Sequence, residues 1–133
     1  MATIRKHSRQ GDAILTCLQG TKSHPTANWV YQQLKPSLPN LSLGTVYRNL
    51  NSLREAGLIQ RVGTVDGFDR FDADTSEHCH FICTCCHEVT DLDLPEAVLA
   101  VRKLAAREIS ADDYVLELTF TGICKNCKSK ENI

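Results

Sequence analysis

The spacing of apolar residues over the first 57 positions predicts three short helices in succession. In each segment the apolar side chains recur every three or four residues, as they do on the buried face of a helix. Each segment follows a serine or threonine that suits the N-cap position, namely Ser8, Thr26 and Ser42. The predicted helices end at Gly20, before Pro36 and at Gly57, because glycine favours a helix terminus and proline forbids continuation.

Two short β-type segments follow at 58–65 and 68–71, and Asp66-Gly67 between them is a strong hairpin signal. Helices followed by a hairpin predict a winged helix-turn-helix, in which the third helix enters the major groove of DNA. With the apolar side of that helix turned inward, we predict DNA contacts from the residues on its outward side, which are Gly44, Tyr47, Arg48 and Asn51. The alternative is that Tyr47 and Arg48 are ordinary surface residues.

The remainder of the chain has the pattern strand, strand, helix, strand, at 78–83, 88–94, 95–109 and 114–121. Pro95 suits the first turn of the predicted helix, whose apolar side carries Val98, Val101, Leu104 and Ala105. In the last predicted strand apolar residues alternate with polar ones, so one of its faces is expected to be buried. A module this small, with an apolar face to cover, predicts a contact between subunits and hence a homodimer.

These elements predict an α+β fold with two domains. Residues 1–74 are expected to form the N-terminal winged helix-turn-helix domain, and residues 75–133 a small C-terminal α/β dimerisation domain. A hydrophobic fraction of 42% and a charged fraction of 23% are ordinary for globular proteins and exclude a disordered or fibrous chain. No run approaches the roughly 18 apolar residues of a membrane span, and the first residues do not resemble a signal peptide, so we expect a cytoplasmic protein without membrane association.

Charge separates the two predicted domains. Residues 1–61 contain eight basic and two acidic side chains, a net charge of +6, whereas the rest of the chain contains seven basic and 14 acidic side chains, a net charge of −7. A cationic helical half favours nucleic-acid binding, and an acidic half suits cation binding. The cationic balance therefore supports the DNA-contact interpretation of the third helix.

Seven cysteines, an odd number without a secretory signal, argue for metal binding rather than disulfide bonds. Two Cys-x-x-Cys pairs, separated by 37 residues, consist of Cys83, Cys86, Cys124 and Cys127. Two such pairs predict a closed, four-sulfur structural Zn²⁺ site with no open position for catalysis. The alternative is four reduced thiols in a core, and Cys85 offers a substitute for either neighbouring ligand.

A second constellation begins with His78-Cys79-His80 in a predicted strand. The two-residue period of a strand turns both imidazoles to one face and Cys79 to the other. His24, Asp72 and Asp91 are further candidate ligands, and such a donor set suits Fe²⁺, Mn²⁺ or Zn²⁺. The spacing alone leaves the ordinary interpretation open, in which His24 belongs to a helix entry and each aspartate is a solvated charge.

At this point the motifs resemble those of the ferric uptake regulator family of metal-dependent repressors, over nearly the whole chain. The matching segments are 24–27 (HPTA), 43–50 (LGTVYRNL), 57–59 (GLI), 70–72 (RFD), 78–83 (HCHFIC) and 122–127 (GICKNC). Within the family the chain is most similar to the peroxide-sensing branch. Cys79, Cys85 and His87 depart from that pattern, and their roles stay open.

The resemblance implies a regulatory Fe²⁺ or Mn²⁺ held by His24, Asp72, His78, His80 and Asp91, besides the structural Zn²⁺. It implies a homodimeric repressor, not an enzyme, that binds double-stranded operator DNA when the regulatory metal is present. It also implies a peroxide response in which the bound iron leads to oxidation of a ligand histidine such as His24 or His78. Mn²⁺ in the same site would support repression without peroxide sensing.

Three alternatives accompany this prediction. The first keeps the fold and changes the signal to iron or zinc sufficiency. The second is a small non-haem metalloenzyme, since two histidines and a carboxylate also bind iron in oxygenases. The third is a thiol redox switch at Cys79 or Cys85.

Overall fold

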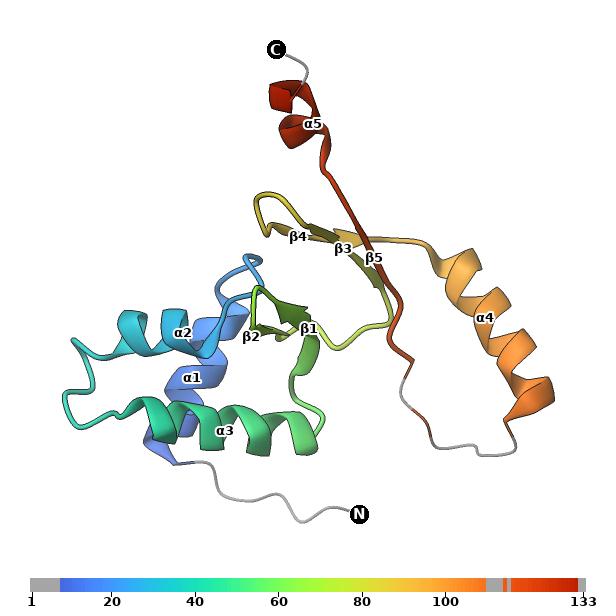
Figure 1. Cartoon of the computed structure of the whole chain (residues 1–133). Coiled ribbons are helices and arrows are strands. Elements are labelled where there is room, and N and C mark those ends of the chain that lie inside the picture. Colours follow the sequence, from blue (N-terminus) through green and yellow to red (C-terminus); the bar gives the residue numbers. More distant parts are fainter. Residues whose placement is uncertain (1–7, 110–113, 115, 132–133) are drawn as a thin grey trace. The chain divides into compact units, whose positions relative to one another are not determined.

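The computed structural model describes residues 8–109, 114 and 116–131, and the chain divides into two compact units, Met1–Thr75 and Ser76–Ile133. We refer to them as the N-terminal and C-terminal units. The elements of the N-terminal unit are α1 (Arg9–Gln19), α2 (Ala27–Leu34), α3 (Leu43–Glu55), β1 (Gln60–Val65) and β2 (Phe68–Asp72) (Figure 1). Those of the C-terminal unit are β3 (Cys79–Cys83), β4 (Val89–Leu92), α4 (Pro95–Glu108), β5 (Thr119–Gly122) and α5 (Lys125–Glu131).

The first three helices begin at side-chain caps. Ser8 Oγ accepts a hydrogen bond from the backbone N–H of Gly11 at 3.0 Å. The hydroxyls of Thr26 and Ser42 accept in the same way, each at 3.1 Å, from the N–H group three residues further along the chain. Because these hydroxyls bind N–H groups that have no partner inside the helix, the helix starts are determined locally. The predicted N-caps are confirmed.

The core of the N-terminal unit lies between the three helices and the first residues of the hairpin. Its buried members are Ile14, Leu18, Ala27, Val30, Leu41, Val46, Leu50, Leu53, Ile59 and Phe71. Gly11 lets α1 approach α3 closely, since a Cβ atom at this position would lie 2.9 Å from Asn49 Oδ1. The packing leaves the opposite side of α3 at the surface.

The hairpin of β1 and β2 turns at Asp66 and Gly67, whose φ angles are 52° and 83°. Two successive residues in the left-handed region are typical of a type I′ turn, which matches the twist of the flanking strands. The ladder shifts register between Arg61 and Gly63, so β1 contains a bulge. The hairpin predicted from the Asp-Gly dipeptide is confirmed, and with the helices it forms the predicted winged helix-turn-helix.

Lys35 stabilises the turn between α2 and α3. Its Nζ donates hydrogen bonds to the carbonyl oxygens of Pro39, at 2.7 Å, and Leu41, at 2.8 Å, and lies 5.6 Å from the centre of the Tyr31 ring. These acceptors belong to the turn that leads into α3. The ammonium group therefore sets the path of the chain into that helix, a role the sequence did not indicate.

The sheet of the C-terminal unit has the strand order β4-β3-β5. Strands β3 and β4 are antiparallel neighbours, and β3 pairs with β5 in parallel, so the chain crosses over through α4 between β4 and β5. In α4, Val98 is buried, and the Arg102 guanidinium pairs with both carboxylate oxygens of Glu77, just before β3. Together these elements confirm the predicted α+β class.

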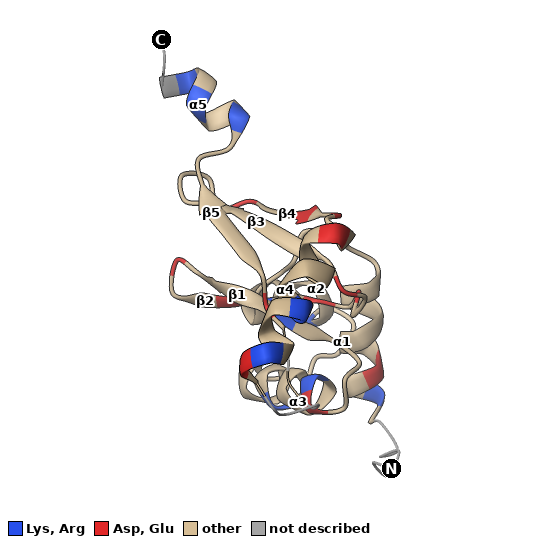
Figure 2. Ribbon diagram, turned by 90° about the vertical axis from the view of Figure 1, so that its right-hand side faces the viewer, with Lys and Arg blue, Asp and Glu red and all other residues tan. Residues whose placement is uncertain are grey.

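The C-terminal unit differs from its prediction in three places. The last strand spans Thr119–Gly122 rather than 114–121, and Val115 lies outside the described residues. Leu104, predicted on the buried side of its helix, is 60% exposed, and Phe120 is 45% exposed. Among the described residues, neither side chain is covered. The sequence also did not predict α5, whose lysines are Lys125, Lys128 and Lys130 (Figure 2).

No helix in the described part of the chain has the length and apolar character that crossing a membrane requires.

We predict that Lys35→Met lowers the free energy of unfolding by about 1–2 kcal/mol, because two charge-assisted hydrogen bonds to backbone carbonyls are lost. Urea unfolding followed by circular dichroism measures the change. Lys22→Met is the matched control, since Lys22 is exposed. Equal unfolding midpoints for the two variants would contradict the role assigned to Lys35.

Candidate metal centres

Four cysteine thiols converge in the C-terminal unit. Cys83 ends β3, Cys86 lies in the turn to β4, Cys124 precedes α5 and Cys127 lies within α5. Their sulfur atoms all lie within 4.8 Å of one another, with Cys83 to Cys127 at 3.8 Å and Cys86 to Cys124 at 3.9 Å. A tetrahedral zinc ion with bonds of about 2.3 Å to sulfur has ligand atoms about 3.8 Å apart. The thiols therefore fit a zinc ion.

Backbone N–H groups surround the first of these sulfurs. The N–H groups of Cys86 and Cys124 both lie 3.4 Å from Cys83 Sγ. These two hydrogen bonds lower the pKa of Cys83 to about 6, which favours the thiolate that binds metal. In contrast, the thiol of Cys124 raises the pKa of Cys127, because neighbouring sulfurs disfavour a second thiolate when no cation is present. This charge pattern also suits a divalent cation.

Cys85 and His87 complete the turn between β3 and β4. Cys85 is exposed and is not one of the four mutually close thiols. His87 has a φ of 64°, and its N–H donates to the Cys83 carbonyl at 2.9 Å. The turn thereby brings Cys86 back toward Cys83.

The N-terminal unit contains a buried histidine–aspartate pair. His24 Nε2 lies 3.2 Å from Asp72 Oδ2, and the two side chains are 3% and 9% exposed. Asp72 ends β2, and the backbone N–H of Asp74 donates to its other oxygen, Oδ1, at 2.9 Å. This second hydrogen bond orients the carboxylate so that Oδ2 faces the imidazole.

The C-terminal unit contains a second set of this kind. His80 on β3 is the register partner of Asp91 on β4, and the ring of His78, the residue before β3, has its centre 4.4 Å from that of His80. The Nε2 atoms of His78 and His80 lie 3.1 and 3.2 Å from the same oxygen, Asp91 Oδ1. Two ligand atoms about 2.1 Å from one ion and about 95° apart are separated by about 3.1 Å. The spacing therefore suits ligands that share a cation.

The other ring nitrogen of His78 supports this interpretation. His78 Nδ1 lies 2.7 Å from the Ser76 carbonyl oxygen. A carbonyl can only accept, so Nδ1 carries a proton, and in the neutral ring Nε2 then has a lone pair directed at the Asp91 carboxylate. A neutral imidazole and a carboxylate that face each other at 3.1 Å are both acceptors, so either a proton on Nε2 or a bound metal ion joins them, and the arrangement suits a metal ion. Two imidazoles and a carboxylate are suitable ligands for Fe²⁺, Mn²⁺ or Zn²⁺.

On α3 the four residues predicted to contact DNA are all exposed: Gly44, Tyr47, Arg48 and Asn51. Arg48 Nη2 donates to Thr45 Oγ1 at 3.0 Å, so the guanidinium lies along the outer side of the helix. Val46, Leu50 and Leu53 are buried on the other side. The side of the helix facing solvent is thus polar and cationic.

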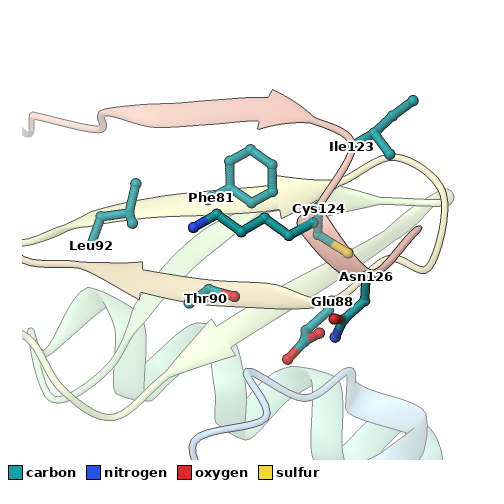
Figure 3. Close-up of a pocket in the computed structure, with 8 residues that line it drawn as sticks. Phe81, Glu88, Thr90, Leu92, Ile123, Cys124 and Asn126 are labelled. Carbon is teal, nitrogen blue, oxygen red and sulfur yellow. The ribbon is translucent and has the colours of Figure 1, made fainter. Parts of the chain in front are cut away.

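A hollow of about 650 Å³ lies over the sheet of the C-terminal unit, beside the thiol cluster (Figure 3). Phe81, Thr90 and Leu92 line it from β3 and β4, and Ile123 and Cys124 from the segment that leads into α5. Ile123 is 45% exposed.

Sequence reasoning missed two features of these centres. Arg70 donates a hydrogen bond to the backbone carbonyl of His24. The Ser76 carbonyl oxygen lies within hydrogen-bond distance of His78 Nδ1 and so orients that imidazole. Arg70 lies two residues before the predicted ligand Asp72 in the Arg-Phe-Asp motif, but an arginine at a strand surface carries no signal of its own.

The chain is similar to known proteins over nearly its whole length. Residues 3–119 match the sequence model of the Ferric uptake regulator family. The peroxide operon regulator of Bacillus subtilis is 38% identical over 92% of this chain and 84% of its own length. The peroxide-responsive repressor PerR of Staphylococcus epidermidis is 35% identical over 99% of this chain and 90% of its own length.

Among solved structures, the Campylobacter jejuni peroxide stress regulator has a TM-score of 0.74 and 30% sequence identity to this chain. The match covers 89% of this chain and 88% of that one. Sequence and fold therefore agree on the same group of proteins.

We expect Cys124→Ser to lose bound zinc and to unfold the C-terminal unit at lower temperature, because zinc binding contributes directly to the folding of such sites. Metal analysis of the purified variant and a thermal melt measure both effects. Cys85→Ser is the matched control and should keep about one zinc ion per chain. Loss of zinc in both variants alike would mean that Cys85 is also a ligand.

Proposed function

Because this chain belongs to the ferric uptake regulator family, we propose that it is a metal-dependent transcription repressor that responds to hydrogen peroxide. The observation that carries the proposal is the pairing of each imidazole of His24, His78 and His80 with an aspartate oxygen at 3.1–3.2 Å. The similarity to peroxide-responsive repressors over most of the chain supports hydrogen peroxide as the signal. On this proposal the protein is a cytoplasmic regulator and not an enzyme.

One regulatory ion would be held by ligands from both units: His24 and Asp72 from the N-terminal unit, and His78, His80 and Asp91 from the C-terminal unit. Cys83, Cys86, Cys124 and Cys127 would hold the structural Zn²⁺. A shared ion restricts the relative orientation of the two domains, 1–74 and 75–133, so metal binding and DNA affinity are linked. Fe²⁺, when bound there, would supply the electron that reduces peroxide, and His24 and His78 would be the ligands open to oxidation.

Operator DNA is the proposed partner of the N-terminal unit. Tyr47, Arg48 and Asn51 are exposed on α3, and Gly44 allows the start of the helix to approach DNA closely. The cationic balance of residues 1–61 supports attraction to phosphates.

A second copy of this chain is the proposed partner of the C-terminal unit. Its exposed apolar side chains include Leu99, Leu104 and Phe120, which are 55%, 60% and 45% exposed. Burial of such side chains between two copies stabilises a homodimer. Two-fold symmetry would then place two recognition helices on the half-sites of a near-palindromic operator.

We predict that the Mn²⁺ form keeps operator affinity after a low dose of peroxide, whereas the anaerobically loaded Fe²⁺ form loses it. The lost affinity should accompany a gain of one oxygen atom, about 16 Da, on a peptide that contains His24 or His78. Fluorescence anisotropy with labelled operator DNA and peptide mass spectrometry measure the two effects.

His24→Ala is the control for the site, because it removes a ligand without changing α3. If the Fe²⁺ and Mn²⁺ forms both keep DNA after peroxide, the protein senses metal supply, and the peroxide part of the proposal is wrong. If neither metal increases operator affinity, the metal-dependent repressor is itself contradicted.

Arg48→Ala should weaken operator binding about 10- to 100-fold, the effect expected when one direct contact of about 1–3 kcal/mol is lost. Arg107→Ala, in α4, removes the same charge from the other unit and should change affinity less than about twofold. Anisotropy titrations at several salt concentrations distinguish a base contact from a phosphate contact, since only the latter lowers the salt slope by about one. Wild-type affinity of Arg48→Ala would exclude this residue from the interface.

A further inference from the structure

Arg70 of β2 binds the backbone of the loop before α2. Its Nε donates to the carbonyl oxygen of His24, and its Nη2 donates to that of Ser23 at 2.9 Å. The planar guanidinium presents donors in a fixed fork, which suits two adjacent acceptors. Because the guanidinium is partly buried, its pKa is lowered from the usual value.

The next residue of β2 extends the same contact. The backbone N–H of Phe71 donates to the Pro25 carbonyl at 3.0 Å. Three consecutive carbonyls of the loop, from Ser23 to Pro25, are therefore bound by two consecutive residues of β2. Asp72, the third residue in this row, contacts the imidazole of His24.

The loop requires such support because His24 has a φ of 54°. A residue other than glycine is strained in the left-handed region, and this backbone conformation is kept only where the surrounding contacts stabilise it. In this conformation the ring of His24 faces Asp72 while its carbonyl faces Arg70. The backbone contact and the position of the ring are thus coupled through one residue.

We infer that Arg70 is a positioning residue of the regulatory metal site, which holds the Ser23–His24 backbone so that His24 Nε2 faces the Asp72 carboxylate. The inference rests on the proposed function, in which His24 and Asp72 bind the regulatory ion. Although Arg70 belongs to the hairpin of a winged helix, its guanidinium stabilises this loop rather than binding a DNA phosphate.

The test compares the full-length protein, with its structural zinc retained, in four variants: Arg70→Met, Arg70→Lys, Arg61→Met and His24→Ala. Mn²⁺ is the probe, and electron paramagnetic resonance of the free ion gives its affinity. Arg61 is the matched control, because it is an arginine of the facing strand β1 whose guanidinium lies near Thr64 and Asp69.

We expect Arg70→Met to weaken Mn²⁺ binding about 10- to 100-fold, the range typical for partners of metal ligands, and Arg61→Met to change it less than about twofold. Arg70→Lys should show an intermediate loss, since one ammonium group replaces the fork only in part. Lys at this position also provides a test if the Met variant does not fold. At saturating Mn²⁺, the Arg70 variants should bind operator DNA with the wild-type salt slope.

A second readout separates positioning from general stability. Co²⁺ in the regulatory site has visible absorption bands that depend on its ligand geometry, so Arg70→Met should change the spectrum of the saturated site. An unchanged spectrum together with wild-type Mn²⁺ affinity would overturn the inference. A salt slope lowered by about one at saturating Mn²⁺ would overturn it too, because it would identify Arg70 as a phosphate contact.

His24→Ala distinguishes failure of this inference from failure of the proposed function. If His24→Ala loses Mn²⁺ binding and both Arg70 variants keep it, only the role of Arg70 is wrong. If His24→Ala binds Mn²⁺ like the wild type, the regulatory site does not include His24, and the ligand set of the proposed function is wrong together with the role of Arg70.

Discussion

The convergence of four thiols is the constraint on which the C-terminal unit depends. The sheet is short, α4 contributes one buried side chain, Val98, and several of the buried positions are cysteines. Such a unit buries too little apolar surface to be stable through packing alone. The thiols join the end of β3, the following turn and the start of α5, so an ion bound there contributes to folding itself.

The N-terminal unit is held together by an apolar core instead of by a metal site. Its core is apolar and holds α3 with one side buried, which leaves the other side available to DNA. Strand β2 ends in Asp72 and contacts the loop before α2, so the wing also shapes a histidine–aspartate pair. Any movement of that loop therefore affects the candidate ligand and the entry to α2 together.

The two His–Asp sets are the basis of the proposed regulatory site. Each places imidazole nitrogens and a carboxylate oxygen at separations that suit ligands of one cation. On the proposed function, an ion that takes ligands from both sets would shift the relative arrangement of the two domains by its binding free energy, because interfaces between domains are often weak. A homodimer would turn this shift into a change in the spacing of two recognition helices.

Local chemistry determined much of this protein. Ser8, Thr26 and Ser42 mark helix starts because their hydroxyls bind N–H groups three residues away, and Asp66-Gly67 defines the hairpin because both residues tolerate a positive φ. The Cys-x-x-Cys spacing likewise indicated a zinc site, since two thiols at this spacing can reach one ion.

Tertiary structure decided the rest. Arg70 and Lys35 act on carbonyls of loops whose positions depend on how helices and strands pack, so neither role is visible in the sequence. Leu104 and Phe120 are exposed although their patterns predict burial, because the spacing of apolar residues indicates which face is apolar and not which other segment covers it. Sequence patterns thus specify which side chains avoid water or bind metal, and only the packed chain specifies which distant groups they meet.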